Sequence, residues 1–362
     1  MGDSRKYRLG VVGLGEGRSI ISAALQSEMW ELVNICDLNE ELCHERMNEF
    51  GLTRYTADYE ELLGDDGIDV IAIYTPDQLH GLHIRQALEA GKHVICTKPL
   101  LLSLDEAKDL LECRKKYNRH VFVGQSSRFF EPMIRQREDF EKGLHGELIS
   151  VEAHYNTDAR WFLQKGWSRK KGFSWMYNFM IHAVDLVRWY LPDITEVYGC
   201  GAVSPNTREY GLECYDTMKV LFTDKRGRFG LAGGSYAVPC RGIDPTIACT
   251  IRGTNGTTKS EYPRLVYHTN FADKGYQMNT YEEKHGYYFR FEGESHHAGE
   301  YQNYIEYFAK SLDNNEIPKP DLEEGIVTIA VLAATERSLE TGMPVKVNDV
   351  LREYGLSELE IS

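Results

Sequence analysis

Short apolar runs and amphipathic stretches alternate over the first third of the chain. The apolar runs, which we expect to be strands, cover residues 8–14, 31–37, 70–75, 93–97 and 120–124. The stretches between them carry apolar side chains at helical spacing and cover residues 20–29, 40–50, 79–90 and 104–117. Strands that alternate with helices in this order predict a parallel sheet with helices on both faces.

Beyond residue 125 the pattern changes to strands separated by turn signals. We expect these strands at residues 147–155, 196–203, 217–223, 228–237 and 246–253. Helical spacing is found over residues 176–190, 301–312 and 322–340. Such an order is typical of an α+β domain built around a mainly antiparallel sheet. We therefore predict an α/β domain over residues 1–125 and an α+β domain over residues 126–362.

Length and composition agree with two folded domains. At roughly 150 residues per domain, 362 residues suffice for two cores. The formal charge of −14 and the lack of a long Lys/Arg block argue against nucleic acid and anionic membranes as partners. No apolar run approaches the roughly 18 residues of a membrane-spanning helix. The eight cysteines form no Cys-x-x-Cys pair and no close group with histidines, so we predict reduced thiols, no bound metal and a cytoplasmic location.

A glycine-rich turn follows the first expected strand and opens the first expected helix. Glycines at this place let backbone amides approach a pyrophosphate at the helix N-terminus. The third glycine of the pattern Gly-x-Gly-x-x-Gly is due at Arg18, and Gly17 comes one place early. The motif alone therefore leaves a purely structural turn open. The candidate cofactor-binding residues of this loop are Gly13, Gly15, Glu16, Gly17 and Arg18.

Asp37 strengthens the nucleotide interpretation. It ends the second expected strand, 19 residues after Arg18. A carboxylate about 20 residues past the glycines hydrogen-bonds the adenosine ribose hydroxyls in NAD-binding proteins, and it would repel the 2′-phosphate of NADP. Asp37 also fits a helix cap before residues 38–41. The cofactor interpretation makes the first domain a Rossmann domain that binds NAD in preference to NADP.

Further motifs, spread over nearly the whole chain, resemble one known family. They are Ile-Tyr-Thr-Pro-Asp-Gln-Leu-His at 73–80, Ala-Gly-Lys-His-Val at 90–94, Lys-Pro-Leu at 98–100, residues 124–129, His-Ala-Val-Asp-Leu at 182–186 and the tail 301–345 with Arg337-Ser338 and Gly342. By these motifs the chain is similar to the Gfo/Idh/MocA oxidoreductases, which include glucose-fructose oxidoreductase, inositol dehydrogenases and many sugar dehydrogenases.

The resemblance implies a nicotinamide held in a cleft between the domains and a large open C-terminal sheet through which the protein forms homo-oligomers. In this family the lysine matching Lys98 lies beside nicotinamide and substrate. The step from Lys98 to Pro99 usually marks an unusual turn, so we expect an unusual peptide bond at or just before Pro99. The expected cofactor-binding residues from these motifs are Thr75, Pro76, His80, Thr97, Lys98 and Gln125.

Oxidation of a secondary alcohol needs a base for the hydroxyl proton and a group that steadies the developing alkoxide. By the resemblance, Lys98 and His182 take these tasks, although each residue alone is as readily a solvated strand end or a core histidine. Like-charge repulsion from NAD+ should lower the pKa of Lys98. The unperturbed pKa of histidine is about 6.5 and needs little change for this role. Asp185 lies on the same helical face as His182 and either orients the imidazole or pairs with Arg188.

Three departures from the family pattern indicate a rebuilt substrate pocket. Thr97 stands where a glutamate usually precedes Lys-Pro, and Asn178 stands where an aspartate is common. The usual glycine-rich stretch before the second-domain helix is replaced by Gly-Phe-Ser-Trp-Met-Tyr at residues 172–177. These changes weaken the case for a carboxylate-assisted base.

Aromatic side chains are dense in residues 155–179, which contain eight of them. Aromatic faces suit the C–H faces of pyranose rings, and the polar neighbours Asn156, Asp158 and Arg160 suit hydroxyls, although ordinary packing explains part of the set. The adjacent His296 and His297 cannot easily face one metal ion, so we expect no metal there. Instead, we expect His297 to lie on a loop and reach a sugar hydroxyl. The candidate substrate-binding residues are Tyr155, Asn156, Arg160, Trp175, Asn178, His182 and His297.

The sequence therefore predicts an NAD-dependent oxidoreductase that oxidises a ring hydroxyl of a sugar or glycoside, with His182 as base. The aromatic segment resembles bacterial glycoside 3-oxidoreductases, which make 3-keto sugars, including from plant C- and O-glucosides. An inositol or free-sugar dehydrogenase, a redox glycosidase that recycles its bound NAD, and a non-catalytic NAD-binding sensor remain open alternatives. Lys98 and His182 together speak against the sensor.

Overall fold

The structure is a computed structural model that describes residues 6–164, 173–281 and 299–361. The chain divides into two compact units, which are described separately. The described part of unit 1 runs to Phe129 and resumes over residues 299–326. Unit 2 comprises the described residues of 130–281 and those from Val327 onwards. The predicted boundary after residue 125 lies close to the first break, whereas residues 301–326, assigned above to the second domain, group with unit 1.

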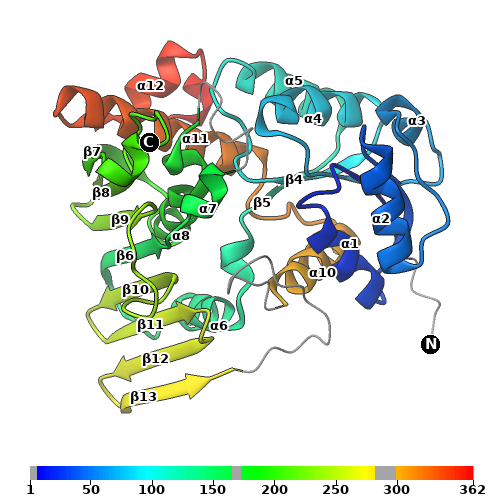
Figure 1. Ribbon diagram of the computed structural model, residues 1–362. Coiled ribbons are helices and arrows are strands. Elements are labelled where there is room, and N and C mark those ends of the chain that lie inside the picture. Colours follow the sequence, from blue (N-terminus) through cyan, green and yellow to red (C-terminus); the bar gives the residue numbers. More distant parts are fainter. Residues whose placement is uncertain (1–5, 165–172, 282–298, 362) are drawn as a thin grey trace. The chain divides into compact units, whose positions relative to one another are not determined.

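Unit 1 contains the predicted parallel sheet with alternating helices (Figure 1). Its strands, hydrogen-bonded in the order β2-β1-β3-β4-β5, are β1 (Tyr7–Val12), β2 (Trp30–Cys36), β3 (Val70–Ile73), β4 (His93–Thr97) and β5 (Val121–Gly124). Its connecting helices are α1 (Arg18–Gln26), α2 (Glu40–Phe50), α3 (Tyr59–Leu63), α4 (His80–Glu89) and α5 (Ala107–Tyr117). Every strand of this sheet is parallel to its neighbours, as the alternation of runs predicts.

Helix α10 (Glu300–Asp313) explains why a late segment belongs to unit 1. The Phe308 ring stacks on Phe122 of β5 with ring centroids 5.1 Å apart. The indole Nε1 of Trp30 donates a hydrogen bond to the carbonyl of Ile305 at 3.0 Å. The apolar face of α10 therefore joins the core of the parallel sheet. The amphipathic pattern of this helix marks a buried face but does not say which sheet it covers.

Unit 2 is built on a nine-stranded sheet in the order β13-β12-β11-β10-β6-β9-β8-β7-β14. The strands are β6 (Leu148–Asn156), β7 (Ile194–Ala202), β8 (Thr217–Asp224), β9 (Phe229–Ser235), β10 (Ile247–Gly253), β11 (Gly256–Tyr262), β12 (Val266–Phe271), β13 (Gly275–Thr280) and β14 (Val345–Lys346). Only β6 and β9 pair in parallel, so the prediction of a mainly antiparallel sheet is confirmed.

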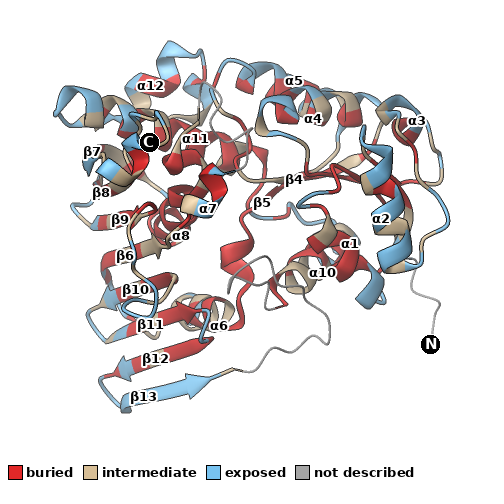
Figure 2. Cartoon of the chain, viewed as in Figure 1, coloured by how far each residue is buried: buried red, intermediate tan, exposed pale blue. Residues whose placement is uncertain are grey.

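Strands β11 to β13 extend the sheet beyond the strands predicted from the sequence. Every residue of β13 is exposed, and Figure 2 shows this strand in pale blue. In β13 only Tyr276 and Met278 alternate with polar residues, and two apolar positions in a six-residue run are a weak signal for a strand. The sequence therefore underestimates the width of this sheet.

The helices of unit 2 include α6 (Glu131–Glu141), α7 (Arg160–Leu163), α8 (Ile181–Tyr190), α9 (Pro205–Arg208) and α12 (Val347–Glu353), and α11 (Leu322–Thr341) starts in unit 1 and continues into unit 2. Helix α8 packs on β6, β9 and β10. The helix predicted over residues 176–190 is divided, because Met176–Met180 form a π-helical turn before α8 begins. Such turns are frequent next to functional sites.

Three further observations concern the described part of the chain. No helix there is long and apolar enough to cross a bilayer. The same residues contain no group of three or more His, Cys, Asp or Glu side chains arranged to hold a metal ion. All eight cysteines are free thiols, five of them buried.

Candidate functional site

The candidate cofactor residues of unit 1 follow the carboxyl ends of its parallel strands. The glycine loop follows β1, Asp37 follows β2, Thr75 comes after β3, Lys98 after β4, and Gln125 after β5. The carboxyl ends of parallel strands lie at one edge of the sheet. The chain moves from β1 to β2 on one side and to β3 on the other, so the strand order reverses at β1. Open α/β sheets bind ligands in the crevice at this point.

The three glycines of the loop have different tasks. Gly13 has φ +86°, and a Cβ there would meet the backbone of Tyr74 and Thr75. Gly17 is the residue before α1, and a Cβ there would meet the Gly13 carbonyl. A Cβ on Gly15 would meet no protein atom within 4 Å. Gly13 and Gly17 thus serve the fold, while Gly15 keeps open space beside the loop, as close approach of a pyrophosphate requires.

Asp37 joins the end of β2 to the glycine loop. Its Oδ2 accepts the Leu14 N–H at 2.8 Å, and its Oδ1 accepts the Asn39 N–H at 2.9 Å. The helix-cap alternative falls to Asn39, whose side chain accepts the N–H groups of Glu41 and Leu42 at the start of α2. A carboxylate has about four acceptor positions. Asp37 therefore retains acceptor capacity for ribose hydroxyls while it fixes the loop.

His80 differs from the other candidate cofactor residues. Its side chain is completely buried. One ring nitrogen, Nδ1, lies 2.7 Å from the Pro99 carbonyl oxygen, and Nε2 lies 2.9 Å from the Thr75 carbonyl oxygen. Whichever nitrogen carries the proton donates to one of these carbonyls, and the ring lies between the loop after β3 and the loop after β4. It positions these loops instead of presenting a free nitrogen to a ligand.

Lys98 follows β4 at a turn with an unusual peptide, as predicted, because the Lys98–Pro99 bond is cis. Its side chain is partly exposed. Burial lowers the pKa of Lys98, and the carboxylates of Asp77 and Glu16 oppose this effect. The cause in the protein alone is burial, whereas the expectation from the sequence concerned repulsion by bound NAD+. Glu16 itself is exposed on the glycine loop.

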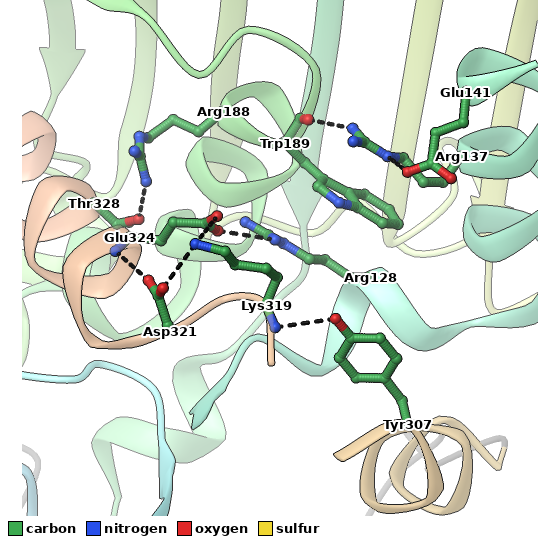
Figure 3. Close-up of polar contacts among 10 residues, drawn as sticks. All are labelled: Arg128, Arg137, Glu141, Arg188, Trp189, Tyr307, Lys319, Asp321, Glu324 and Thr328. Carbon is green, nitrogen blue, oxygen red and sulfur yellow. Dashed lines mark hydrogen bonds and ion pairs between the residues drawn. The ribbon is translucent and has the colours of Figure 1, made fainter. Parts of the chain in front are cut away.

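Gln125 follows β5 and is 2% exposed. Within the described chain, its side-chain oxygen Oε1 is buried without a hydrogen-bond partner. The segment is anchored, because the Arg128 N–H donates to the Gln125 carbonyl at 3.2 Å and the Arg128 guanidinium pairs with Glu324 at 3.4 Å (Figure 3). An unpaired buried amide oxygen is costly, which makes Gln125 a suitable acceptor for a ligand N–H or O–H.

In unit 2 the candidate base His182 lies on α8 and is 8% exposed. The Tyr155 ring, at the end of β6, meets it edge-on with centroids 5.3 Å apart. Asp185, one turn further along α8, is 1% exposed. The structure thus brings Tyr155 and His182 together, as candidate substrate and catalytic residues, where α8 packs on the antiparallel sheet.

Two arginines anchor the C-terminal end of α8. The Arg188 guanidinium donates to the hydroxyl of Thr328, and that of Arg137 donates to the Trp189 carbonyl (Figure 3). Arg137 also pairs with Glu141, one turn further along α6. These bonds hold the helix that carries His182. Asp185 was expected either to orient His182 or to pair with Arg188, and the Thr328 bond uses one of the five N–H donors of Arg188.

The other candidate substrate residues are mostly engaged by the protein. Trp175 is completely buried and stacks on Tyr236 at 5.9 Å. The Arg160 guanidinium binds both carboxylate oxygens of Asp158 at 2.8 and 2.6 Å. The Asn178 amide donates to the Ser174 carbonyl at 3.0 Å, and the Asn156 amide donates to Asp244 at 3.4 Å. His297 lies outside the described residues.

Two relevant residues were not found from the sequence. Tyr236, which directly follows β9, is completely buried, and its hydroxyl has no hydrogen-bond partner among the described residues. No local pattern distinguishes it from a core tyrosine. Glu49 on α2 holds Arg18, and the sign alternation of Arg46 and Glu49 at helical spacing was the available signal.

Comparison with known proteins identifies the family of both parts of the chain. A family model described as an oxidoreductase family with an NAD-binding Rossmann fold matches residues 7–125. A second model, the C-terminal alpha/beta domain of the same oxidoreductase family, matches residues 137–347. Together the two models cover most of both units.

Named relatives align over most of the chain. Myo-inositol 2-dehydrogenase of Thermotoga maritima is 25% identical over 346 residues, which is 95% of this chain and 99% of that protein. scyllo-Inositol 2-dehydrogenase (NAD(+)) of Bacillus subtilis is 27% identical over 84% of this chain and 85% of its own length. A solved levoglucosan dehydrogenase, in complex with NADH and levoglucosan, superposes with a TM-score of 0.81 at 21% identity over 94% of this chain and 99% of that one.

Proposed function

Because the chain belongs to the Gfo/Idh/MocA oxidoreductase family, we propose that it oxidises a ring hydroxyl of a sugar or glycoside with NAD+ as the acceptor. The observation that carries this proposal is the carboxyl edge of the parallel sheet. Four features follow strands of this sheet there: the open space at Gly15, the Asp37 carboxylate, the partly exposed Lys98 and the buried Gln125 oxygen, which has no partner among the described residues. Inositol and levoglucosan dehydrogenases among the relatives support a sugar or polyol substrate.

The residues of this edge fit NAD. The backbone around Gly15 is open to a pyrophosphate, and Asp37 has acceptor positions left for ribose hydroxyls. The buried Gln125 oxygen suits an N–H donor such as a carboxamide. The negative charge of Asp37 disfavours a 2′-phosphate, which supports NAD over NADP. When bound, NAD+ supplies the hydride acceptor.

Two side chains of this protein accept the hydroxyl proton and stabilise the developing alkoxide. His182 takes the hydroxyl proton on an imidazole nitrogen, because a histidine accepts protons in the neutral pH range. Lys98 donates hydrogen bonds to the alcohol oxygen and stabilises the negative charge that develops on it. Asp185, buried beside His182 on α8, orients the imidazole. Thr97 and Asn178 stand at positions where the family commonly has carboxylates, so Lys98 and His182 act here without those neighbours.

The finer proposal is a glycoside oxidised at C-3, which gives a 3-keto sugar. Tyr155 supports it, because its ring is partly exposed and touches His182, so it offers an apolar wall beside the proposed base. Aromatic walls suit the C–H face of a pyranose. Trp175 is enclosed and supports this wall from behind through Tyr236.

The test is incubation of the purified protein and NAD+ with glucosides, levoglucosan and inositols, following NADH by absorbance and keto sugar by mass spectrometry. The proposal expects turnover of at least one glucoside with keto-sugar formation. Turnover of inositols alone would reject a glycoside as the substrate and would leave the proposal of an NAD-dependent inositol dehydrogenase. Release of aglycone and free sugar without added NAD+ and without net keto sugar, by protein that carries copurified NAD, would favour the redox glycosidase with recycled cofactor. Binding of NAD+ without turnover of any compound would favour the sensor.

We also propose that the antiparallel sheet pairs with a second copy of the chain. Tyr198 and Leu221 are directly opposed on β7 and β8, and Leu221 is opposed to Leu231 on β9. Tyr198 is 43% and Leu221 40% exposed. An exposed apolar cluster of this kind on a sheet face is typical of an interface. Light scattering should show an oligomer for the parent and smaller species for Leu221→Glu, whereas a monomeric parent would exclude the interface.

A further inference from the structure

The corner between the glycine loop and α2 contains two arginines held by one carboxylate. Glu49 Oε2 accepts a hydrogen bond from Arg46 at 2.9 Å, and Oε1 accepts one from Arg18 Nε at 2.6 Å. The side chains of Arg46 and Glu49 are only 14% and 20% exposed. Arg18 begins α1 directly after the glycine loop, and Arg46 and Glu49 lie on α2. Glu49 therefore bridges the two helices that flank the loop.

This corner adjoins Asp37 through a single residue. The Leu14 N–H is bound by Asp37, while the Leu14 carbonyl accepts a hydrogen bond from Arg46 Nε at 3.2 Å. The Arg46 guanidinium and the Asp37 carboxylate thus hold opposite ends of one loop residue. A ribose hydroxyl at Asp37 would have Arg46 as a near neighbour.

The charges of the corner cancel in pairs. Asp37 and Glu49 are negative, and Arg18 and Arg46 are positive. Arginine binds phosphate through its forked N–H donors. Here Arg18 and Arg46 each direct at least one donor to Glu49, and Arg46 Nε donates to the Leu14 carbonyl. Removal of Asp37 alone would leave both guanidinium groups bound to Glu49. Removal of both carboxylates would leave two arginines whose strongest acceptor is lost.

We propose that Glu49 is a second residue that determines coenzyme specificity, because it withholds Arg18 and Arg46 from the 2′-phosphate of NADP. The inference rests on the proposed placement of the adenosine ribose at Asp37. Asp37 excludes the phosphate by repulsion, and Glu49 excludes it by occupying the cations that would bind it. Replacement of Asp37 alone therefore does not create an NADP site.

The test is calorimetric titration of NAD+ and NADP+ into four proteins: the parent, Asp37→Ser, Glu49→Gln and the double variant. We expect Asp37→Ser to lose about tenfold or more in NAD+ affinity and to bind NADP+ weakly. The double variant should bind NADP+ about 10- to 100-fold more tightly than Asp37→Ser, the effect of one or two charge-assisted hydrogen bonds. Its NADP+ affinity should fall steeply with added KCl.

Glu45→Gln in the Asp37→Ser background is the matched control. Glu45 lies on the same helix, is 59% exposed and approaches Arg46 only to 3.9 Å. The Glu45→Gln substitution removes one negative charge, as Glu49→Gln does, but it does not release the arginines. The NADP+ affinity should therefore change little. Equal NADP+ affinities of Asp37→Ser and the double variant, or an equal gain from Glu45→Gln, would overturn the role of Glu49. Undiminished NAD+ affinity of Asp37→Ser would instead overturn the ribose placement. Glu49→Ala, checked by its urea midpoint, replaces Glu49→Gln if that variant does not fold.

Discussion

Gly13 lies so close to the backbone of Tyr74 that a side chain cannot be added without moving one of the two strands. The contact joins the end of β1 to the end of β3, at the point where the strand order reverses. The positive φ of Gly13 adds a second reason why an L-residue is strained there. Gly15, two residues later, faces open space. The same loop thus contains one glycine required by the fold and one available to a ligand.

Gly13→Ala and Gly15→Ala form a matched pair. We expect Gly13→Ala to lower the free energy of unfolding by about 2 kcal/mol or more, because the chain must shift and adopt an unfavourable φ. Gly15→Ala should leave stability nearly unchanged and weaken NAD+ binding by about tenfold or more, because its methyl group enters the space used by the ligand. Urea unfolding and calorimetry measure both effects. Equal stability losses in the two variants would contradict this division of tasks.

Acid should destabilise unit 1 through His93. Burial, then the charges of His120 and Arg119, lower the pKa of His93 to about 4. Its Nδ1 accepts the His120 N–H at 3.1 Å, so protonation there breaks a bond. The pKa of a histidine in the unfolded chain is about 6.5. Between these values the unfolded chain binds more protons, so the stabilisation is present above about pH 6.5 and is lost as the pH falls toward 4.

The loss amounts to up to about 3 kcal/mol over the full range. It is measured as the difference in urea midpoint between pH 7 and pH 5. His93→Asn keeps an acceptor for the His120 N–H and removes the titrating group. The variant should therefore show a smaller decrease between these pH values than the parent, and an unchanged decrease would rule out His93 as the source.

Gln125→Leu should separate stability from cofactor binding. In the protein without cofactor the buried Oε1 has no described partner, so the apolar substitution should be neutral or stabilise by about 1 kcal/mol. NAD+ affinity should fall about tenfold, since the acceptor is lost. The control is Gln136→Leu in unit 2, where the amide donates to the Cys249 carbonyl at 3.0 Å. That variant should lose stability and retain NAD+ affinity; an NAD+ affinity unaffected by Gln125→Leu would remove Gln125 from the site.

Lys98→Arg should change the alkaline side of the pH profile. Lys98 stabilises the alkoxide only as an ammonium group, and burial lowers its pKa, so kcat/KM should fall at a lower pH than for an ordinary lysine. Arginine stays protonated. The variant should be slower at every neutral pH, and its alkaline decline should move to higher pH. A profile of log kcat/KM with the same alkaline limb for both proteins would assign that limb to another group.

The sequence predicts the nucleotide edge of unit 1 better than the substrate region of unit 2. The strands before Gly13, Asp37, Thr75 and Lys98 are buried runs flanked by helices, so their ends could be located and their common edge followed from parallel topology. The role of His80 could not be predicted, because its two carbonyl partners depend on how the loops fold. The enclosure of Trp175 depends likewise on Tyr236, which is 61 residues away in sequence. Local patterns contain no information on such contacts.

The proposal that Lys98 and His182 act on one alcohol is tested most directly by single-turnover NADH formation in the parent, Lys98→Met, His182→Asn and the double variant, using a substrate that the parent oxidises. Each single variant should slow hydride transfer by about 10²- to 10⁴-fold, and the double should lose much less than the product of the two. Parental rates in either single variant, or strictly multiplicative losses in the double, would contradict a shared alcohol.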